Sequence, residues 1–223
     1  YQMFGINAEL LIDHAWGYES CTIAQIRAYK PQSSSLGCGQ VLHCPYTADK
    51  ARIVVQEMID GISLELVEKR LVTDQLVLTV GYDIENLTRP EIRKVYKGPV
   101  TTDRYGRRVP KHAHGTWNLP RATSSSSELL EAMAALYDKI VNPALLIRRM
   151  SLSACHVVNE KMAKEREQKE TFEQLDLFTD YAKKEAKEKE EQKKRERERR
   201  MQEALLTIKK KYGKNAVLRG MNF

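Results

Sequence analysis

The segment 89–111 combines many cations with few acids. It contains eight basic residues against two acidic ones, with Tyr96 and Tyr105 between them. Flexible cations of this kind bind nucleic-acid phosphates without reading the base sequence. A solvated loop that binds nothing has the same composition, so both interpretations stay open. The basic residues are Arg89, Arg93, Lys94, Lys97, Arg104, Arg107, Arg108 and Lys111.

A short apolar peptide interrupts the highly charged C-terminal part of the chain. It consists of Gln174, Leu175, Asp176, Leu177 and Phe178. Leucine and phenylalanine anchors can enter a hydrophobic pocket on a partner, while a glutamine adds directional hydrogen bonds. The peptide is therefore a candidate docking motif. The alternative is that its apolar side chains fold back onto the chain as local core.

The residue patterns give no support to an enzyme. No phosphate-binding loop, dinucleotide-binding loop or zinc-protease motif occurs. His112 and His114 would share one face of a strand and could ligate a metal, although polar residues on a sheet face are the commoner case. Cys38 and Cys44 beside His43 present the same choice between a metal site and free thiols. We predict no catalytic residue, no metal site and no cofactor in this chain.

The periodicity of apolar residues predicts the elements that position these candidates. The order is β-α-β-β-α-β, which favours an α+β domain over residues 34–158 with a four-stranded antiparallel sheet and two helices on one face. The other face of the sheet is then free to bind a partner. The predicted elements are a strand at 34–42, a helix at 50–69, a strand at 73–82, a strand at 112–120, a helix at 124–137 and a strand at 144–158.

Three details of this domain can be checked. Asp49 is the expected N-cap of the first helix, and Ser125 with Glu128 resembles a capping box before the second. The first helix is expected to bury the face that carries Ile53, Val54, Met58, Ile62 and Leu66. Arg148 and Arg149 are adjacent in a strand, so one should face the helices with a partner and the other should lie on the open face or its edge.

The flanking segments differ from this domain. Residues 1–23 contain one short predicted helix within 5–16, and residues 24–33 are interpreted as a linker. Residues 159–223 are a charged tail, either a solvated helix or disordered. The net charge of +7 favours an anionic partner. No run of about 18 apolar residues predicts a membrane span, and the chain begins at Tyr1 in an apolar pattern, as we expect of a fragment.

Several segments resemble Y-family (UmuC- and DinB-like) translesion DNA polymerases. GINAELLIDHAWGYE at 5–19 is similar to the end of the thumb domain. SSSLGCGQVLHCPYT at 33–47 and ALLIRRMSLSACHVV at 144–158 resemble the first and last strands of the little-finger domain. QLDLF at 174–178 resembles the bacterial sliding-clamp motif. KKKYGKNAVLRG at 209–220 is similar to the C-terminus of UmuC-like proteins of Gram-positive bacteria.

The resemblance implies a DNA-binding and clamp-tethering role in DNA repair and the SOS response. Backbone phosphates would be held by strand amides, by Ser33, Ser34 and Ser35, by Arg148 or Arg149, and by the basic segment. The palm and fingers domains are missing, so magnesium-dependent synthesis past lesions belongs to a parent polymerase, whose palm and fingers would be partners of this chain. The first strand also lacks the lysine that usually leads it. A cytoplasmic location without a membrane partner is expected.

Two other functions remain as alternatives. The same sheet and tail would serve a stand-alone accessory protein that binds DNA and the clamp without any polymerase. A charged-helix scaffold built on residues 160–204 would instead form a coiled coil or bind RNA, although that segment lacks a sustained heptad of apolar residues.

Overall fold

The computed structural model describes residues 1–29, 34–103, 105–170, 181–213 and 215–217. The chain divides into two compact units, Tyr1–Ser33 and Ser34–Phe223. Each unit is treated by itself below. Across the described residues, no helix is both long enough and apolar enough to cross a membrane.

The first unit contains two short helices, α1 (Asn7–Ala15) and α2 (Ile23–Ala28). The first matches the predicted helix, whereas α2 lies mostly in the segment interpreted as a linker. A capping box starts α2: the Gln25 backbone N–H donates to Thr22 Oγ1 at 3.3 Å, and the Thr22 N–H donates to Gln25 Oε1 at 2.8 Å. Of the described residues in this unit, Ala8 alone is buried, so the two helices build no core of their own.

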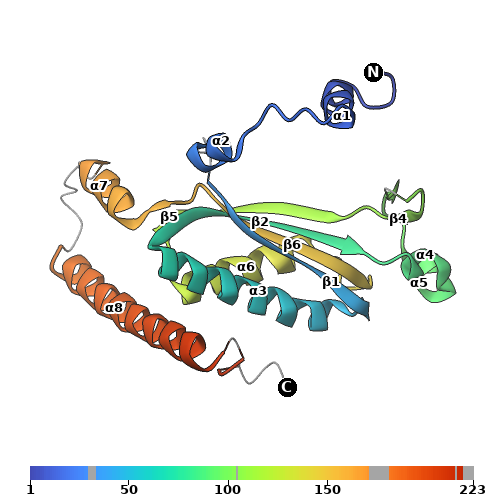
Figure 1. The fold of residues 1–223 in the computed structure, drawn as a ribbon. Helices are drawn as coiled ribbons and strands as arrows, with labels where there is room; N and C mark the ends of the chain where they lie inside the picture. Colours follow the sequence, from blue (N-terminus) through green and yellow to red (C-terminus); the bar gives the residue numbers. More distant parts are fainter. Residues whose placement is uncertain (30–33, 104, 171–180, 214, 218–223) are drawn as a thin grey trace. The chain divides into compact units, whose positions relative to one another are not determined.

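The second unit is built on an antiparallel sheet (Figure 1). Its strands are β1 (Leu36–Tyr46), β2 (Leu71–Tyr82), β5 (Ala113–Thr123) and β6 (Ile147–Cys155), in the spatial order β1-β6-β2-β5. Every neighbouring pair is antiparallel. The short strand β7 (Val158–Asn159) also pairs with the start of β2, which makes the sheet larger than the predicted four strands.

Two helices, α3 (Ala48–Lys69) and α6 (Ser126–Ile140), cover one face of the sheet (Figure 1). Each connects two strands that run parallel to one another, with an antiparallel strand between them. The result is two interleaved split β-α-β units. The predicted α+β class and the antiparallel sheet with both helices on one face are confirmed.

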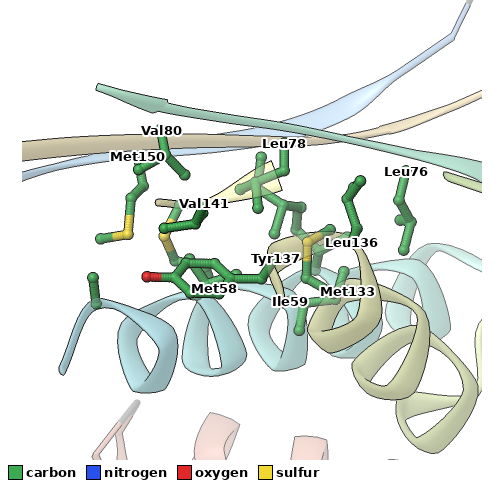
Figure 2. Close-up of a cluster of buried hydrophobic side chains, with 14 of the residues drawn as sticks. Met58, Ile59, Leu76, Leu78, Val80, Met133, Leu136, Tyr137, Val141 and Met150 are labelled. Atoms are coloured by element: carbon green, nitrogen blue, oxygen red, sulfur yellow. The ribbon is translucent and has the colours of Figure 1, made fainter. Parts of the chain in front are cut away.

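The core lies between the sheet and these helices. Leu76, Leu78 and Val80 of β2 face Ile59 of α3 and Met133 of α6, and all five are fully buried (Figure 2). Alternate residues of the strands supply this layer, because successive side chains of a strand point to opposite faces. The remaining alternate residues lie on the open face of the sheet.

One predicted detail of α3 was wrong, and a second was correct only in part. The helix begins after Thr47, so Asp49 stands in its first turn, where its charge still complements the helix dipole. Of the predicted buried face, Met58, Ile62 and Leu66 are buried, whereas Ile53 is 36% exposed. The buried face also includes Ala51, Val55 and Ile59. The physical reason is that small and β-branched side chains line the strip of α3 closest to the sheet. From the apolar pattern alone, these buried positions could not be distinguished from the exposed Ile53.

The polar connection between β2 and β5 is structured. It forms the short helices α4 (Glu85–Thr88) and α5 (Pro90–Val95), followed by a hairpin of β3 (Val100–Thr102) and β4 (Arg108–Pro110). The strands of this hairpin are too short for a periodic signal, which is why the sequence showed only a loop.

The tail contains α7 (Glu160–Glu170) and α8 (Tyr181–Tyr212). The C-terminal half of α8 is not a freely solvated helix, because it contacts α3 and places Gln202 at 2% exposure. The predicted choice between a solvated helix and disorder therefore omitted a third possibility, a charged helix docked on the domain.

Candidate nucleic-acid interface

On the open face of the sheet, β2 and β5 carry polar side chains on either side of Val77. Gln75 of β2 donates its side-chain amide to Asn118 Oδ1 of β5 at 2.9 Å. Thr79 Oγ1 and His114 Nδ1 lie 2.9 Å apart on the same pair of strands. These cross-strand contacts hold the polar side chains in fixed positions. The surface therefore presents an ordered set of hydrogen-bonding groups.

The half of this face formed by β1 and β6 carries small residues. Gly37 is paired with Ser153, and Gly39 is paired with Ser151. A Cβ added at Gly37 would stand 2.9 Å from Ser153 Oγ and 3.2 Å from the Leu152 carbonyl oxygen, so the two strands are closely fitted there. Small side chains allow a ligand to approach the strands, and serine hydroxyls can hydrogen-bond to phosphate oxygens.

The two adjacent arginines of β6 take different roles. Arg148 Nε lies 3.7 Å from Oδ2 of the buried Asp83. Arg149 is exposed on the open face and lies across Gly81 of β2, where an added Cβ would stand 2.6 Å from Arg149 Cγ. This agrees with the predicted division, and it makes Arg149 the member of the pair that is available to an anion.

Two of the predicted phosphate-binding arginines are engaged in ion pairs. Arg89 Nη2 lies 2.5 Å from Glu85 Oε2, and Arg107 Nη2 lies 2.8 Å from Asp103 Oδ2. Hydrogen bonds from the Arg107 side chain and backbone hold the pKa of Asp103 below its usual value. Both ion pairs lie within the connection between β2 and β5, and each leaves its arginine less available to a phosphate.

Five other cations of this region are exposed and have no ion-pair partner among the described residues. They belong to α5, to the turn after it and to the end of the hairpin. The Lys111 backbone N–H donates to the Pro99 carbonyl at 2.8 Å and closes the base of the hairpin. Unpaired cations on this structured connection are available to phosphates. These residues are Arg93, Lys94, Lys97, Arg108 and Lys111.

The hairpin lies at the end of the sheet where Arg149 emerges. Strand β4 contacts β2 and α4, and Arg149 is paired with Gly81 near the last residues of β2 (Figure 1). The fold therefore brings Arg149 and the unpaired cations of the connection to one end of the sheet. This neighbourhood could not be predicted from local sequence patterns, because it depends on the pairing of β2 with β6.

Several predicted residues are not part of this cluster or fall outside the described residues. Ser34 and Ser35 precede β1 and are exposed, and the Ser34 carbonyl accepts a hydrogen bond from Val157 N–H at 3.0 Å. Ser33, Arg104 and the whole peptide Gln174–Phe178 lie outside the described residues. Their predicted roles in DNA and clamp binding stay predictions.

Four residues of the open face were missed at the sequence level. Gly37, Gly39, Ser151 and Ser153 share it with Thr79. The signal for the serines was available, because Ser151 and Ser153 alternate with the buried Met150, Leu152 and Ala154. No group of three or more potential metal-ligating side chains gathers anywhere in the described part of the chain.

Comparison with known proteins gives a limited result. No family model matches the sequence, and no curated protein matches it. One of the solved structures that match is described as a complex of beta-clamp processivity factor and little finger domain of PolIV. The alignment covers 66% of this chain and 100% of that chain, at 9% identity and a TM-score of 0.36. A similarity this distant does not establish a family.

Proposed function

We propose that this chain binds DNA without sequence preference and tethers it to a sliding clamp, as the C-terminal part of a Y-family translesion polymerase. The observation that supports this most directly is the open polar face of the sheet with Arg149 and five unpaired cations at one end. Helices α3 and α6 cover the opposite face, so this face is the one open to a large ligand.

The chemistry of the face suits a phosphate backbone better than base edges. Hydroxyls, amides and flexible lysines bind phosphates and sugars, which fixes position without reading sequence. A sequence-independent grip is what a polymerase needs when it moves along a damaged template.

The wider role depends on the sequence resemblance. In this proposal residues 1–23 complete a thumb domain, magnesium and the catalytic carboxylates belong to the parent's palm and fingers, and residues 174–178 bind the clamp. Many apolar side chains of α1, such as Leu10, Leu11 and Ile12, are exposed within their own unit, which fits a segment that packs against another domain. The stand-alone accessory protein is the rival, and it predicts the same DNA and clamp binding without a polymerase.

The test is DNA binding as a function of salt. The full chain should bind a duplex more weakly as salt rises, because neutralising phosphates releases counterions. Replacing Lys97, Arg108 and Lys111 by alanine should reduce the slope of log affinity against log salt by about 2 to 3, at about 0.9 per phosphate contact. Fluorescence anisotropy on a labelled duplex measures the slope.

A matched control removes the same charge elsewhere. Lys50, Lys139 and Lys161 are exposed, and no ion pair joins them to another described residue. Their alanine variant should keep the slope of the unmodified chain. An equal slope for the two triple variants would reject the connection between β2 and β5 as the phosphate-binding element.

A further inference from the structure

Helix α8 is held against the domain by hydrogen bonds to the first turn of α6. One Glu198 oxygen accepts from the Ser127 N–H at 2.8 Å, and the other accepts from the Ser125 and Ser127 hydroxyls at 2.8 and 3.0 Å. The carboxylate thus satisfies groups at a helix N-terminus, where the helix dipole favours negative charge. This contact fixes one point along α8.

Gln202, one turn further along, makes the buried part of the contact. Its side-chain amide donates to the Ser124 carbonyl at 3.0 Å and to Ser126 Oγ at 2.8 Å. Ser126 Oγ in turn lies 2.7 Å from Ser63 Oγ of α3. Because these groups are buried and hydrogen-bonded to one another, they specify a single rotation of α8 about its axis.

Further contacts extend along the same stripe of α8. Arg199 Nη2 lies 3.4 Å from Glu160 of α7, and Lys210 Nζ lies 2.7 Å from Glu68 of α3. The half-buried Leu205 and Leu206 continue the stripe toward the C-terminus. One face of α8 is therefore turned to the domain, and the opposite face has a fixed direction.

The opposite face carries a row of cations. At 3.6 residues per turn, Lys193, Arg197 and Arg200 fall within one sector of α8 opposite Gln202. Arg200 lies at the edge of this sector, where it also lines the pocket that α8 shares with α7. All three are exposed, and no described residue forms an ion pair with them. Seven residue steps separate Lys193 from Arg200, or about 10 Å of helix, which matches about three nucleotide steps along the axis of one strand.

We propose that this row is a second phosphate-binding surface, which takes a nucleic-acid backbone at a place separate from the open sheet face. Docking through Glu198 and Gln202 converts a charged tail into a rigid surface whose cations are already aligned. Helix α8 contacts α3 and the first turn of α6, the two helices that cover the far side of the sheet, so one straight duplex cannot occupy both surfaces. The inference rests on the proposed DNA-binding function and adds a second site to it.

A nucleic-acid backbone fits the row better than an acidic protein surface does. The row is regular, and its apolar neighbour Met201, at 59% exposure, is a single side chain, whereas protein interfaces centre on clusters of aromatic or aliphatic residues. Glu203 is engaged by Arg199 Nε at 3.1 Å, and Glu196 flanks the row. An evenly spaced polyanion matches such a row directly.

The experiment compares three alanine variants of the full chain. The first changes Lys193, Arg197 and Arg200, the second changes Lys97, Arg108 and Lys111, and the third is the control with Lys50, Lys139 and Lys161 changed. Each is titrated into labelled single-stranded DNA and into a duplex of about 30 base pairs over a range of salt. Alanine is a strong helix former, so the first variant should keep α8 helical, which circular dichroism checks.

We expect the first variant to lose about 10- to 100-fold in affinity at 0.1 M salt for at least one of the two DNA probes. Its slope of log affinity against log salt should be reduced by about 2 to 3. Affinities and slopes equal to those of the control for both probes would overturn the second surface. If the hairpin variant then still shows its own loss, the proposed function stands and only this inference fails. If neither variant loses DNA affinity, both the proposed function and the second phosphate-binding surface are rejected.

Discussion

At the scale of single residues, the contact between Gly81 and Arg149 sets the position of the Arg149 side chain on the open face. The Arg149 side chain lies directly over Gly81, with room for no Cβ beneath it. A glycine within a strand is otherwise unfavourable, because it has no side chain to pack and adds backbone freedom. Its position under a surface arginine suggests that the space it leaves sets the height of the guanidinium above the sheet.

Replacing Gly81 by alanine should therefore displace Arg149. If Arg149 contacts phosphate, Gly81→Ala and Arg149→Ala should each weaken DNA binding by up to about 10-fold at 0.1 M salt, the value of one contact. The double variant should bind no more weakly than Arg149→Ala alone, since both changes act on one side chain. Additive losses, with all variants folded by thermal denaturation, would show that the glycine acts through something other than Arg149.

At the scale of elements, much of the domain could be predicted from the sequence. The alternation of Leu76, Leu78 and Val80 in β2 and the apolar strip of α6 are strong signals, because burial on one face imposes a period on the chain. Helix α2 could be found only from its capping pair, Thr22 and Gln25, since none of its residues is buried. Its charge-poor sequence carried no periodicity.

Other features of the domain could not be predicted, for a different reason. The docking stripe of α8 is made mostly of Arg195, Glu198, Arg199 and Gln202, so it has no hydropathy signal. The end of the sheet that collects Arg149 with the hairpin depends on strand order, which element order alone does not fix. Polar contacts and long-range pairing are invisible to local patterns.

Gln202 provides a test of the docked element. Gln202→Ala removes the donor to two buried acceptors, which should weaken docking by about 1 to 3 kcal/mol. Hydrogen exchange of the α8 amides near residue 202 should accelerate, while exchange in α3 and β2 stays slow. Gln192→Ala is the control, because Gln192 is exposed on the same helix. Unchanged protection in the Gln202 variant would mean that apolar contacts, not the buried network, hold α8.

At the scale of the whole molecule, the unit Ser34–Phe223 separates its candidate interfaces. The open face and the hairpin lie on the sheet, and the outer row of α8 lies on an element that docks against the helices. The candidate clamp peptide, residues 174–178, lies between α7 and α8 in the sequence. Binding of the clamp and of DNA should therefore be independent events, each tested by its own variants.

The clamp prediction is tested with a peptide and with the full chain. Each fully buried leucine or phenylalanine offers roughly 1.5 to 3 kcal/mol, and ordering takes back about 1 to 2 kcal/mol per residue. The balance favours affinity on the order of micromolar, or about −8 kcal/mol. Leu177→Ala with Phe178→Ala should abolish binding to a bacterial sliding clamp, whereas Asp176→Ala should change it little, because the aspartate is not an anchor. Calorimetry measures both.

The rival interpretation predicts a different pattern in the same titrations. If Leu175, Leu177 and Phe178 form local core, the double variant should lower the melting temperature of the chain and leave clamp heats unaltered. If they are anchors exposed for a partner, the melting temperature should stay within a degree or so while the heats vanish, because removing exposed side chains changes stability little. DNA affinity should be equal in the two chains, since phosphate contacts come from other residues, and a joint loss of DNA and clamp binding would indicate unfolding instead.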